Sequence, residues 1–473
     1  MQMKKLYFIF FLLWSTAVNA AIIYVDKDNS CPGNGSTAGP YCSIQNGLNH
    51  PGLRAGDTIR IRDSAMPYTE NAVTPSGLDG TAANPIVIEP DVGNNPILRS
   101  IATNVDSGVI TINNGSFWTI RNLTFDACGV ATSSKQAIKV QAAPSSNPNR
   151  SLVGIVITGN TINCWGGSDQ GGANRDGSNV YRTAAIRIEG TNIAPGQPGY
   201  TTQYTTATIS NNMISRAKET GIFLQHNSAT VVSDNTITGT RCGVHNNTDS
   251  YRAEEGVKIA FSGKNNIIIQ NSIHDFQDEA ACYSAISSRP EGYNVTAGGI
   301  YCDTGSTGDL VDRNRIYSMN LNNSGSGQSY GNGIFWEARC KNGTIRNNLI
   351  NNILSDNGAG INTGETSCAG NTGNRILQNK IHNVKRVGII LRKYTQNITV
   401  KNNVVWMTAS TARDYFVEVW QEAVTCGGHV IDGNIYNSTG GNAAYRWGRN
   451  RTTTLSGWQS LCSCDANSAT REF

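Results

Sequence analysis

The main pattern of hydrophobic and polar residues in this sequence is a short phrase that recurs along most of the chain. It begins as Gly-apolar-x-apolar, passes through a polar turn and continues into a second short apolar segment with an asparagine-bearing turn. Clear copies start at Gly221, Gly256, Gly333 and Gly388. Short strands repeated in this way predict stacked coils rather than a globule built around one central core.

The asparagine turns give the spacing of the coils. They centre near Asn122, Asn160, Asn212, Asn235, Asn271, Asn314, Asn347, Asn379, Asn402 and Asn434. The gap from Asn212 to Asn235 is 23 residues, which we take as the basic coil length. Asparagine tolerates left-handed backbone geometry, and stacked amides can hydrogen-bond to one another, so we expect these residues to be structural. Longer gaps predict polar loops at 243–255, 275–298, 320–332 and 364–374.

The composition and charge mainly exclude one class of partner. The 473 residues include 50 glycines, and only 15% of the residues are charged. A net charge of +4 on this length, without a basic stripe, argues against nucleic acid as a partner. We expect a monomer.

The N-terminus has the pattern of a secretion signal, assigned to residues 1–20. Lys4 and Lys5 precede an apolar run from Leu6 to Trp14, and Val18-Asn19-Ala20 supplies a small-x-small cleavage site. The run is too short for a membrane span. The sequence therefore predicts a secreted protein, extracellular or periplasmic, that starts at Ala21 and does not cross a membrane.

The twelve cysteines fit an oxidising compartment. Cys31 and Cys42 flank a glycine-rich loop, and we expect them to form a disulfide. Cys462-Ser463-Cys464 lacks the two-residue gap of common zinc sites, so disulfides are favoured over a metal cluster.

Several segments carry a resemblance to a known fold. Tyr24-Val25-Asp26, Pro40-Tyr41-Cys42-Ser43-Ile44-Gln45 and Ala55-Gly56-Asp57-Thr58-Ile59, together with the asparagine-turn coils, resemble exported right-handed parallel β-helix proteins of the pectate-lyase-like superfamily. The resemblance implies an all-β, single-stranded right-handed parallel β-helix over 108–445. An N-terminal cap with the first coils would occupy 21–107, and a short C-terminal cap 446–473. The superfamily includes lyases, glycoside hydrolases, epimerases and surface proteins, so the fold does not settle the function.

Strand alternation predicts which side chains of the Gly-apolar-x-apolar strands point outward. A first outward column would contain Arg187, Phe223, Lys258, Tyr301, Phe335, Asn362, Ile390 and Glu418. A second would contain Glu189, Gln225, Ala260, Asp303, Glu337, Gly364, Arg392 and Trp420. Coils stack about 4.8 Å apart, so neighbours in a column would be neighbours in space.

The middle of these columns holds the candidate site. Asp303 and Glu337 would be vertical neighbours, with Lys258, Tyr301 and Phe335 beside them. Arg339 would extend the patch, and the flanking loops would bring up His245, Tyr251, Arg252, Glu254, Glu255 and Arg289. Aromatic rings pack on sugars and cations bind acidic groups, so the cluster suits a polysaccharide. The structural alternative is a solvated face with paired charges.

The first functional hypothesis is β-elimination on a uronate-containing polysaccharide, since lyases of the superfamily use Lys or Arg, often with Ca²⁺. Lys258 would be the base and Arg289 or Arg339 the charge neutraliser. Asp303, Glu337, Glu254 and Glu255 would supply oxygen ligands for Ca²⁺. Tyr301, Phe335, Arg392, Tyr251 and His245 would contact the substrate. The Glu254-Glu255-Gly256-Val257-Lys258 segment loosely resembles the chondroitinase B and alginate lyase branch, although its acid-to-lysine spacing is shorter.

Two alternatives stay open at this stage. Asp303 and Glu337 could serve a glycoside hydrolase or an epimerase without Ca²⁺, because neighbouring coils would hold their carboxyls at roughly the 5 Å used by retaining enzymes. The chain could also be a carbohydrate-binding or surface protein without catalytic activity.

Overall fold

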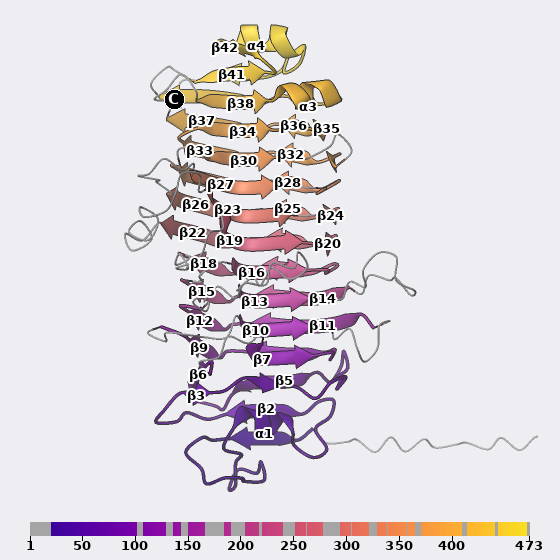
Figure 1. Cartoon of the computed structure of the whole chain (residues 1–473), viewed down its shortest axis with the longest axis vertical. Coiled ribbons are helices and arrows are strands. Elements are labelled where there is room, and N and C mark those ends of the chain that lie inside the picture. Colours follow the sequence, from indigo (N-terminus) through magenta and orange to yellow (C-terminus); the bar gives the residue numbers. More distant parts are fainter. Residues whose placement is uncertain are drawn as a thin grey trace, which may run out of the picture.

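The computed structural model describes residues 20–101, 107–128, 136–142, 150–165, 184–190, 204–216, 220–239, 251–261, 263–277, 294–303, 305–320, 329–337, 339–355, 357–364, 370–408, 414–439 and 443–470. Its strands stack into three long sheets of 13 strands each, which run along one axis (Figure 1). We name them sheets A, B and C, in the order in which each coil visits them.

Sheet A consists of β1 (Ile22–Val25), β2 (Thr58–Ile61), β5 (Ile86–Pro90), β8 (Trp118–Arg121), β11 (Leu152–Thr158), β14 (Thr205–Ser210), β17 (Val231–Ser233), β21 (Ile267–Ile269), β25 (Leu310–Asp312), β28 (Thr344–Arg346), β32 (Arg375–Leu377), β36 (Thr399–Lys401) and β39 (Val430–Asp432). Sheet B consists of β3 (Tyr68–Thr69), β6 (Ile97–Arg99), β9 (Thr124–Asp126), β12 (Thr161–Asn163), β15 (Met213–Ser215), β18 (Thr236–Thr238), β22 (Ser272–Gln277), β26 (Arg315–Asn320), β29 (Leu349–Ile353), β33 (Lys380–Val384), β37 (Val404–Thr408), β40 (Ile435–Thr439) and β43 (Ala469–Thr470).

Sheet C consists of β4 (Ala72–Val73), β7 (Gly108–Asn113), β10 (Gln136–Gln141), β13 (Ala184–Glu189), β16 (Thr220–Gln225), β19 (Tyr251–Ala260), β23 (Asn294–Asp303), β27 (Ser329–Trp336), β30 (Ala359–Thr363), β34 (Val387–Leu391), β38 (Tyr415–Val419), β41 (Ala444–Trp447) and β42 (Asn450–Thr452). Two short pairs complete the strands: β20 (Gly263–Lys264) with β24 (Ser306–Thr307), and β31 (Asn371–Thr372) with β35 (Thr395–Gln396). Neighbouring strands of the three long sheets run parallel, except for the antiparallel pair β41–β42.

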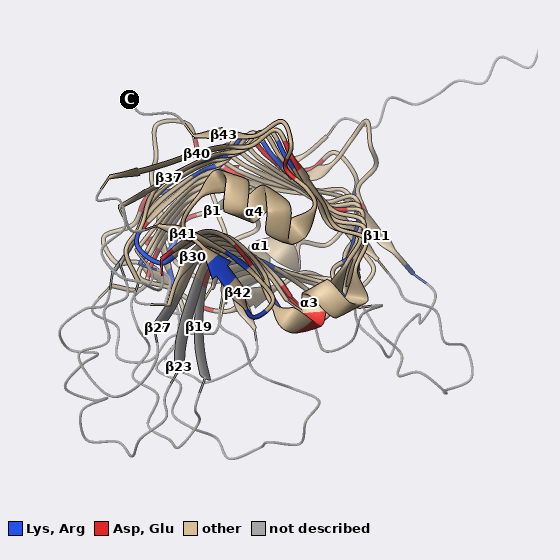
Figure 2. Cartoon of the chain, turned by 90° about the horizontal axis from the view of Figure 1, so that it is seen from above, with Lys and Arg blue, Asp and Glu red and all other residues tan. Residues whose placement is uncertain are grey.

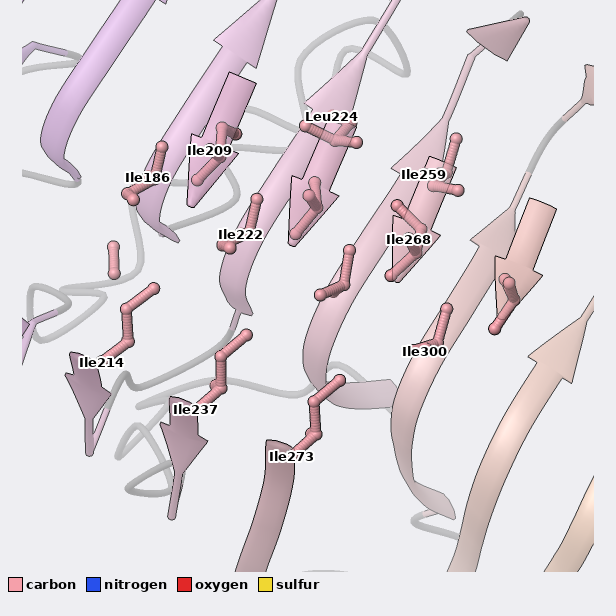
Figure 3. Close-up of a cluster of buried hydrophobic side chains, with 14 of the residues drawn as sticks. Ile186, Ile209, Ile214, Ile222, Leu224, Ile237, Ile259, Ile268, Ile273 and Ile300 are labelled. Carbon is pink, nitrogen blue, oxygen red and sulfur yellow. The ribbon is translucent and has the colours of Figure 1, made fainter. Parts of the chain in front are cut away.

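The core is a set of aliphatic stacks along the inside of the coils. Ile222, Ile259 and Ile300 of sheet C face Ile237 and Ile273 of sheet B, and all five are fully buried. Figure 3 shows Ile214, Ile237 and Ile273 of sheet B in one row, with one side chain per coil. Each coil thus buries its apolar residues against the next coil, which is why the repeat sets the fold.

The recurring glycine of the sequence phrase has a steric cause. A Cβ on Gly299 would lie 2.5 Å from Ile316 Cγ2 and 2.7 Å from the carbonyl oxygen of Gly333. A Cβ on Gly256 would lie 2.5 Å from Ile273 Cγ2, so the same contact recurs one coil earlier. Only glycine lets sheet C approach sheet B this closely.

The asparagine turns form a hydrogen-bonded ladder between sheets A and B, as predicted. However, two residues are needed in each turn, one for the ladder and one for the left-handed backbone. The side-chain oxygen of Asn314 accepts hydrogen bonds from the backbone and amide nitrogens of Asn271, each at 3.0 Å. Asn314 itself donates to Asn348, and the ladder members are Asn160, Asn212, Asn235, Asn271, Asn314, Asn348, Asn379, Asn403 and Asn434. The left-handed residue is the one before each ladder asparagine, for example Asn347 (φ 55) and Asn402 (φ 57). The prediction that one asparagine in each turn fills both roles is therefore wrong: beside Asn347 and Asn402, the ladder is formed by Asn348 and Asn403.

Short helices lie near the two ends of the stack. α1 (Ile44–Leu48) begins after Ser43, whose hydroxyl accepts a hydrogen bond from the nitrogen of Asn46. α3 (Gln421–Cys426) and α4 (Leu455–Cys462) lie at the C-terminal end, where Trp458 is fully buried. Seen from above, α4 lies over the opening of the coils (Figure 2). None of the described helices is long and apolar enough to cross a membrane.

The expected disulfide between Cys31 and Cys42 is formed. Further disulfides join Cys128 to Cys164, Cys302 to Cys340 and Cys462 to Cys464, and Cys426 is also disulfide-bonded. These bonds indicate a protein that folds outside the cytoplasm.

Candidate functional site

The candidate site lies on the outer face of sheet C, where three strands are the longest of the sheet. β19 and β23 have ten residues each and β27 has eight, against six in β16 and five in β30. Their N-terminal parts occupy the ends of the stretches predicted as loops at 243–255, 275–298 and 320–332. Figure 2 shows β19, β23 and β27 side by side on one side of the molecule.

The strand register places Asp303 and Glu337 on neighbouring rungs, where a rung is one strand of sheet C together with the residues that directly follow it. Lys258 pairs with Tyr301, and Tyr301 with Phe335. Cys302 pairs with Trp336, and the nitrogen of Glu337 donates to the carbonyl oxygen of Cys302 at 2.9 Å. Glu337 therefore follows Asp303 directly in the second outward column, about one strand spacing away.

Lys258 is held between two carboxylates. Its Nζ lies 3.0 Å from Glu255 Oε1 and 3.1 Å from Asp303 Oδ2, and its side chain is only 2% exposed. The other oxygen of Glu255 accepts a hydrogen bond of 2.8 Å from the hydroxyl of Thr220. A buried ammonium needs such compensation, so the four side chains form one unit across three rungs.

Tyr301 connects this unit to Glu337. The Lys258 Nζ lies 4.3 Å from the centre of the Tyr301 ring, and the Tyr301 hydroxyl donates a hydrogen bond to Glu337 Oε2. The ring also stacks on Phe335, with 5.1 Å between the ring centres. The two rings thus fix the hydroxyl that contacts Glu337.

The two candidate carboxyls have different surroundings. Burial raises the pKa of Glu337, the hydrogen bond from Tyr301 opposes this, and the charge of Asp303 raises the pKa further. The net result is a pKa above that of an ordinary glutamate. Asp303, in contrast, has a lysine ammonium in direct contact. Burial also raises the pKa of Tyr301 well above its usual value, with the charges of Asp303 and Glu337 adding to the effect, so its hydroxyl stays protonated.

The first outward column is not a solvated face, contrary to the structural alternative. None of its eight residues is more than 8% exposed. They cover one another: Arg187 lies over the Phe223 ring at 5.5 Å, and Lys258, Tyr301 and Phe335 continue the stack. The second column is more open, since Glu337, Arg392 and Trp420 are partly exposed.

The remaining predicted site residues are not all brought into this cluster. Arg339 is exposed and has a left-handed backbone (φ 67) beyond the end of β27, beside Gly305 rather than in the outward columns. Arg289 and His245 lie outside the described residues. For Tyr251 and Glu254 the structure describes the backbone only, in the N-terminal part of β19. Arg392 lies two rungs beyond Glu337 and its charge lowers the pKa of that carboxyl.

Two of the expected calcium ligands, Glu255 and Asp303, contact Lys258. The second oxygen of Glu255 accepts a hydrogen bond from Thr220. The calcium role of Asp303, Glu337, Glu254 and Glu255 stays a prediction. Within the described ranges, no group of three or more His, Cys, Asp or Glu side chains could hold a metal ion.

Sequence reasoning did not identify the pairing of Glu255 with Lys258. On a regular strand, residues three apart point to opposite faces. Here Gly256 and Val257 both face the core, which brings Glu255 and Lys258 to the same side. The signal was present in the sequence, because the recurring glycine always precedes an inward apolar residue. Thr220 occupies the matching position one rung earlier.

Comparison with known proteins supports the architecture. A family model described as periplasmic copper-binding protein (NosD) matches residues 70–280. No curated protein sequence matches the chain. A GH136 lacto-N-biosidase from Eubacterium ramulus has a similar structure, with 12% identity, 89% of this chain and 68% of that chain covered, and a TM-score of 0.59.

Two epimerases have weaker structural similarity. The A-module of the mannuronan C-5 epimerase AlgE6 from Azotobacter vinelandii is 12% identical over 91% of this chain and 94% of that chain, with a TM-score of 0.47. The periplasmic alginate epimerase AlgG is 10% identical over 88% and 76%, with a TM-score of 0.40. The three parallel sheets and the similarity to the lacto-N-biosidase structure confirm that this chain is a right-handed parallel β-helix protein.

Proposed function

We propose that this protein is an extracytoplasmic carbohydrate-active enzyme that hydrolyses glycosidic bonds with Asp303 and Glu337. The observation that carries the proposal is the unequal environment of two carboxyls on adjacent rungs. Burial keeps the pKa of Glu337 raised, whereas Asp303 is in contact with the Lys258 ammonium. Glycoside hydrolysis requires two carboxyls with different roles, and these two differ in that one keeps its proton to higher pH and the other contacts a cation.

The roles follow from these environments. Glu337 donates its proton to the glycosidic oxygen of the leaving sugar. Asp303 acts on the other side of the scissile bond, either as the nucleophile or as the base that activates water. Rungs about 4.8 Å apart favour the close separation of retaining enzymes. Tyr301 acts as a positioning residue, because its hydroxyl contacts Glu337 and its ring rests on Lys258 and Phe335.

The lacto-N-biosidase of similar structure is consistent with a hydrolase on this fold. At 12% identity the similarity concerns the fold alone, so the substrate must come from this chain's own residues. Partly exposed Arg392 and Trp420 continue the column beyond Glu337, which supports an extended polymer rather than a small compact ligand.

A second candidate is β-elimination on a uronate polymer, or epimerisation, which starts with the same proton removal. The observation that favours it is the proximity of Arg392 to Glu337, since a guanidinium can neutralise a uronate carboxylate. We rank it lower because the Nζ of Lys258, the base first predicted, is buried in contact with two carboxylates, Glu255 and Asp303.

Product analysis on a panel of neutral and acidic polysaccharides tests the proposal. We expect new reducing ends without the ultraviolet absorbance of an unsaturated uronate, and no effect of EDTA. Absorbing products that disappear with EDTA would instead support a calcium-dependent lyase. Glu337→Gln and Asp303→Asn should each abolish turnover without changing the far-ultraviolet circular dichroism. No product with any polymer on the panel would favour a binding protein.

A further inference from the structure

The corner where sheet A turns into sheet B carries positive charge on four consecutive coils. The strands and turns concerned span 310–320, 344–353, 375–384 and 399–408, and Asp312 is the single carboxylate residue in these ranges. The same ranges contain six cationic residues, which we call the basic ridge: Arg313, Arg315, Arg346, Arg375, Lys380 and Lys401. The basic ridge is not apparent in the sequence, because its members belong to four separate coils.

Three cations of the basic ridge have no acidic partner. Arg315, Arg375 and Lys380 are exposed, and their side chains form no ion pair within the part of the chain that the structure describes. Arginine and lysine side chains carry only hydrogen-bond donors. The N–H groups of these three residues are therefore available to an acidic ligand.

The other three cations are only partly neutralised. Asp312 Oδ2 lies 3.4 Å from Arg313 Nε and 3.2 Å from Arg346 Nη2, so one carboxylate serves two arginines. Lys401 is the cross-strand partner of Asp432 on the next coil, where the basic ridge ends. Six cations against one carboxylate leave an excess of five positive charges on the four coils, and such an excess attracts anions.

Arg315 and Lys380 lie in one outward column of sheet B. Arg315 is the cross-strand partner of Leu349, and Leu349 is that of Lys380. The two cations are therefore two coils apart, about 10 Å along the axis. Leu349 between them is 38% exposed, so an apolar side chain separates the two charges at the surface. Arg375 lies on the same coil as Lys380, at the start of β32, and extends the charge across the corner.

The Arg315 side chain is held by ring contacts. Its guanidinium carbon lies 4.8 Å from the centre of the Tyr317 ring, and this ring stacks on His274 with 4.3 Å between the ring centres. A guanidinium over a ring keeps its orientation and can still donate from its N–H edge to a carboxylate. Arg315 thus loses little freedom when it binds an acidic group.

The basic ridge lies away from the candidate site. Seen from above, sheet A (β11) and sheet B (β37, β40 and β43) meet on the opposite side of the coil from β19, β23 and β27 (Figure 2). On each of the four coils, the turn from sheet A to sheet B has only two residues, as with Asn347 and Asn348. No loop therefore interrupts the corner on these coils. Small ligands bind in concave sites, so this straight, open surface suits a polymer laid along the axis.

We propose that the basic ridge is a second, non-catalytic binding surface for an acidic polysaccharide. The carboxylates of the polymer pair with Arg315, Arg375 and Lys380, and a sugar ring rests on Leu349. The exposed leucine between two cations favours a polymer of sugar acids, whose rings present C–H groups beside each carboxylate. The inference goes beyond the proposed function, because this surface holds the protein on its polymer and needs no bond cleavage.

Binding of polygalacturonate tests the proposal, with the same polymer after reduction of its carboxyls to alcohols as the second probe. The Glu337→Gln variant serves as the background, since it avoids turnover. Replacing Arg315, Arg375 and Lys380 together by glutamine should weaken the binding of polygalacturonate about tenfold and make it less sensitive to salt. The affinity for the reduced polymer should stay the same.

The matched control replaces Lys264, Arg449 and Arg451 by glutamine. These exposed residues lie outside the basic ridge, and the change in net charge is identical, so neither affinity should change. Three outcomes would overturn the inference. These are equal losses of affinity in the two triple variants, equally tight binding of the reduced polymer, and binding of duplex DNA as tight as that of polygalacturonate.

This proposal and the proposed function fail separately. Unchanged binding of polygalacturonate by the ridge variant, in a protein that hydrolyses polysaccharide, would remove only the second surface. Weakened binding by the ridge variant, in a protein that hydrolyses no polymer, would remove only the proposed function.

Discussion

Cys302 and Cys340 are joined by a disulfide directly behind the two candidate carboxyls. Cys302 precedes Asp303, and its carbonyl oxygen accepts the hydrogen bond from the nitrogen of Glu337. Cys340 follows three residues after Glu337, and its nitrogen donates to the Glu337 carbonyl oxygen at 3.3 Å. Both sulfur-bearing residues are fully buried, so the bond ties the backbones of Asp303 and Glu337 together from the inside of the coil.

Replacing both cysteines by alanine should loosen this pair of carboxyls. A bridge over a 38-residue separation stabilises by about 3–4 kcal/mol in the chain-entropy model, so thermal unfolding should shift down moderately. We expect kcat to fall at least tenfold, because catalysis needs a fixed carboxyl geometry. The matched control is the double replacement of Cys31 and Cys42, in the N-terminal region. Equal activity losses in the two double variants would show that the effect is not local.

Lys258→Met should be more damaging than the removal of a surface charge. It leaves Glu255 and Asp303 buried without their shared cation, which costs about 3–5 kcal/mol when one member of a buried ion pair is removed. Adding Glu255→Gln to Lys258→Met should recover part of the lost thermal stability, because it removes one of the two unpaired charges. A double variant that is less stable than Lys258→Met would contradict the role of Lys258 in compensating the charges of Glu255 and Asp303.

Lys258→Arg separates the two functional hypotheses. Arginine keeps the positive charge but does not deprotonate in proteins, so it cannot act as a general base. If the only role of Lys258 is to compensate the negative charge of Asp303, the Lys258→Arg variant should keep measurable hydrolysis. If Lys258 were the base of a lyase, the variant should produce no unsaturated product. The product assay and the circular dichroism of the same preparation decide between them.

The sequence predicted the fold well because the repeat is a direct consequence of coil packing. Each inward position needs an apolar residue and each close approach of sheets B and C needs a glycine, as at Gly256 and Gly299. The vertical order of Asp303 and Glu337 followed from the same alignment.

The electrostatics of the site did not follow from that alignment. The Glu255–Lys258 contact depends on a local break of strand alternation, and the loops predicted at 243–255 and 275–298 in fact end as strand. Burial of the first column arises from ring and cation stacking between coils, which a one-dimensional pattern does not contain.

The pH dependence of hydrolysis should report on Glu337. Its raised pKa means that the protonated acid persists to higher pH than for an ordinary glutamate, and that activity falls as pH rises through this pKa. The hydrogen bond from Tyr301 lowers the pKa of Glu337, so Tyr301→Phe should raise it and move the alkaline limb of kcat upward by about one pH unit. Tyr317→Phe removes a tyrosine hydroxyl on β26 of sheet B, where the Tyr317 ring stacks on His274, and serves as the matched control. If the alkaline limb of Tyr301→Phe moved to lower pH, Glu337 could not be the acid that sets this limb.

Asp309 should make stability depend on pH in the opposite sense to most carboxylates. It is 1% exposed, and its Oδ1 accepts hydrogen bonds from the backbone and amide nitrogens of Asn266. Burial raises its pKa from 3.8 to about 6, so its stabilising protonated form is fully present below pH 3.8 and is lost as pH rises through about 6. The difference corresponds to about 3 kcal/mol.

Asp309→Asn keeps the acceptor oxygen and removes the titration. We expect the variant to have a higher melting temperature than the unmodified protein at pH 7.5, and the difference to disappear near pH 4. Asp312→Asn should behave in the opposite way. Burial raises the pKa of Asp312, but hydrogen bonds from Asn347 and Arg346 outweigh this and lower it, so its charged form stabilises the fold. If the difference in melting temperature between Asp309→Asn and the unmodified protein did not change with pH, the titration of Asp309 would not contribute to stability.

The neighbouring glycines 298 and 299 offer a sharp test of the packing between sheets. Gly299→Ala places a methyl group 2.5 Å from Ile316 Cγ2 and 2.7 Å from the backbone oxygen of Gly333, and the backbone contact cannot be relieved by a rotamer change. Overpacking of this kind costs about 1–3 kcal/mol. Gly298→Ala meets nothing nearer than Tyr301 Cβ at 3.6 Å, so it should leave thermal stability unchanged. Differential scanning calorimetry of the two variants side by side measures the contrast. Equal melting temperatures would mean that the glycine repeat does not arise from the contact between sheets B and C.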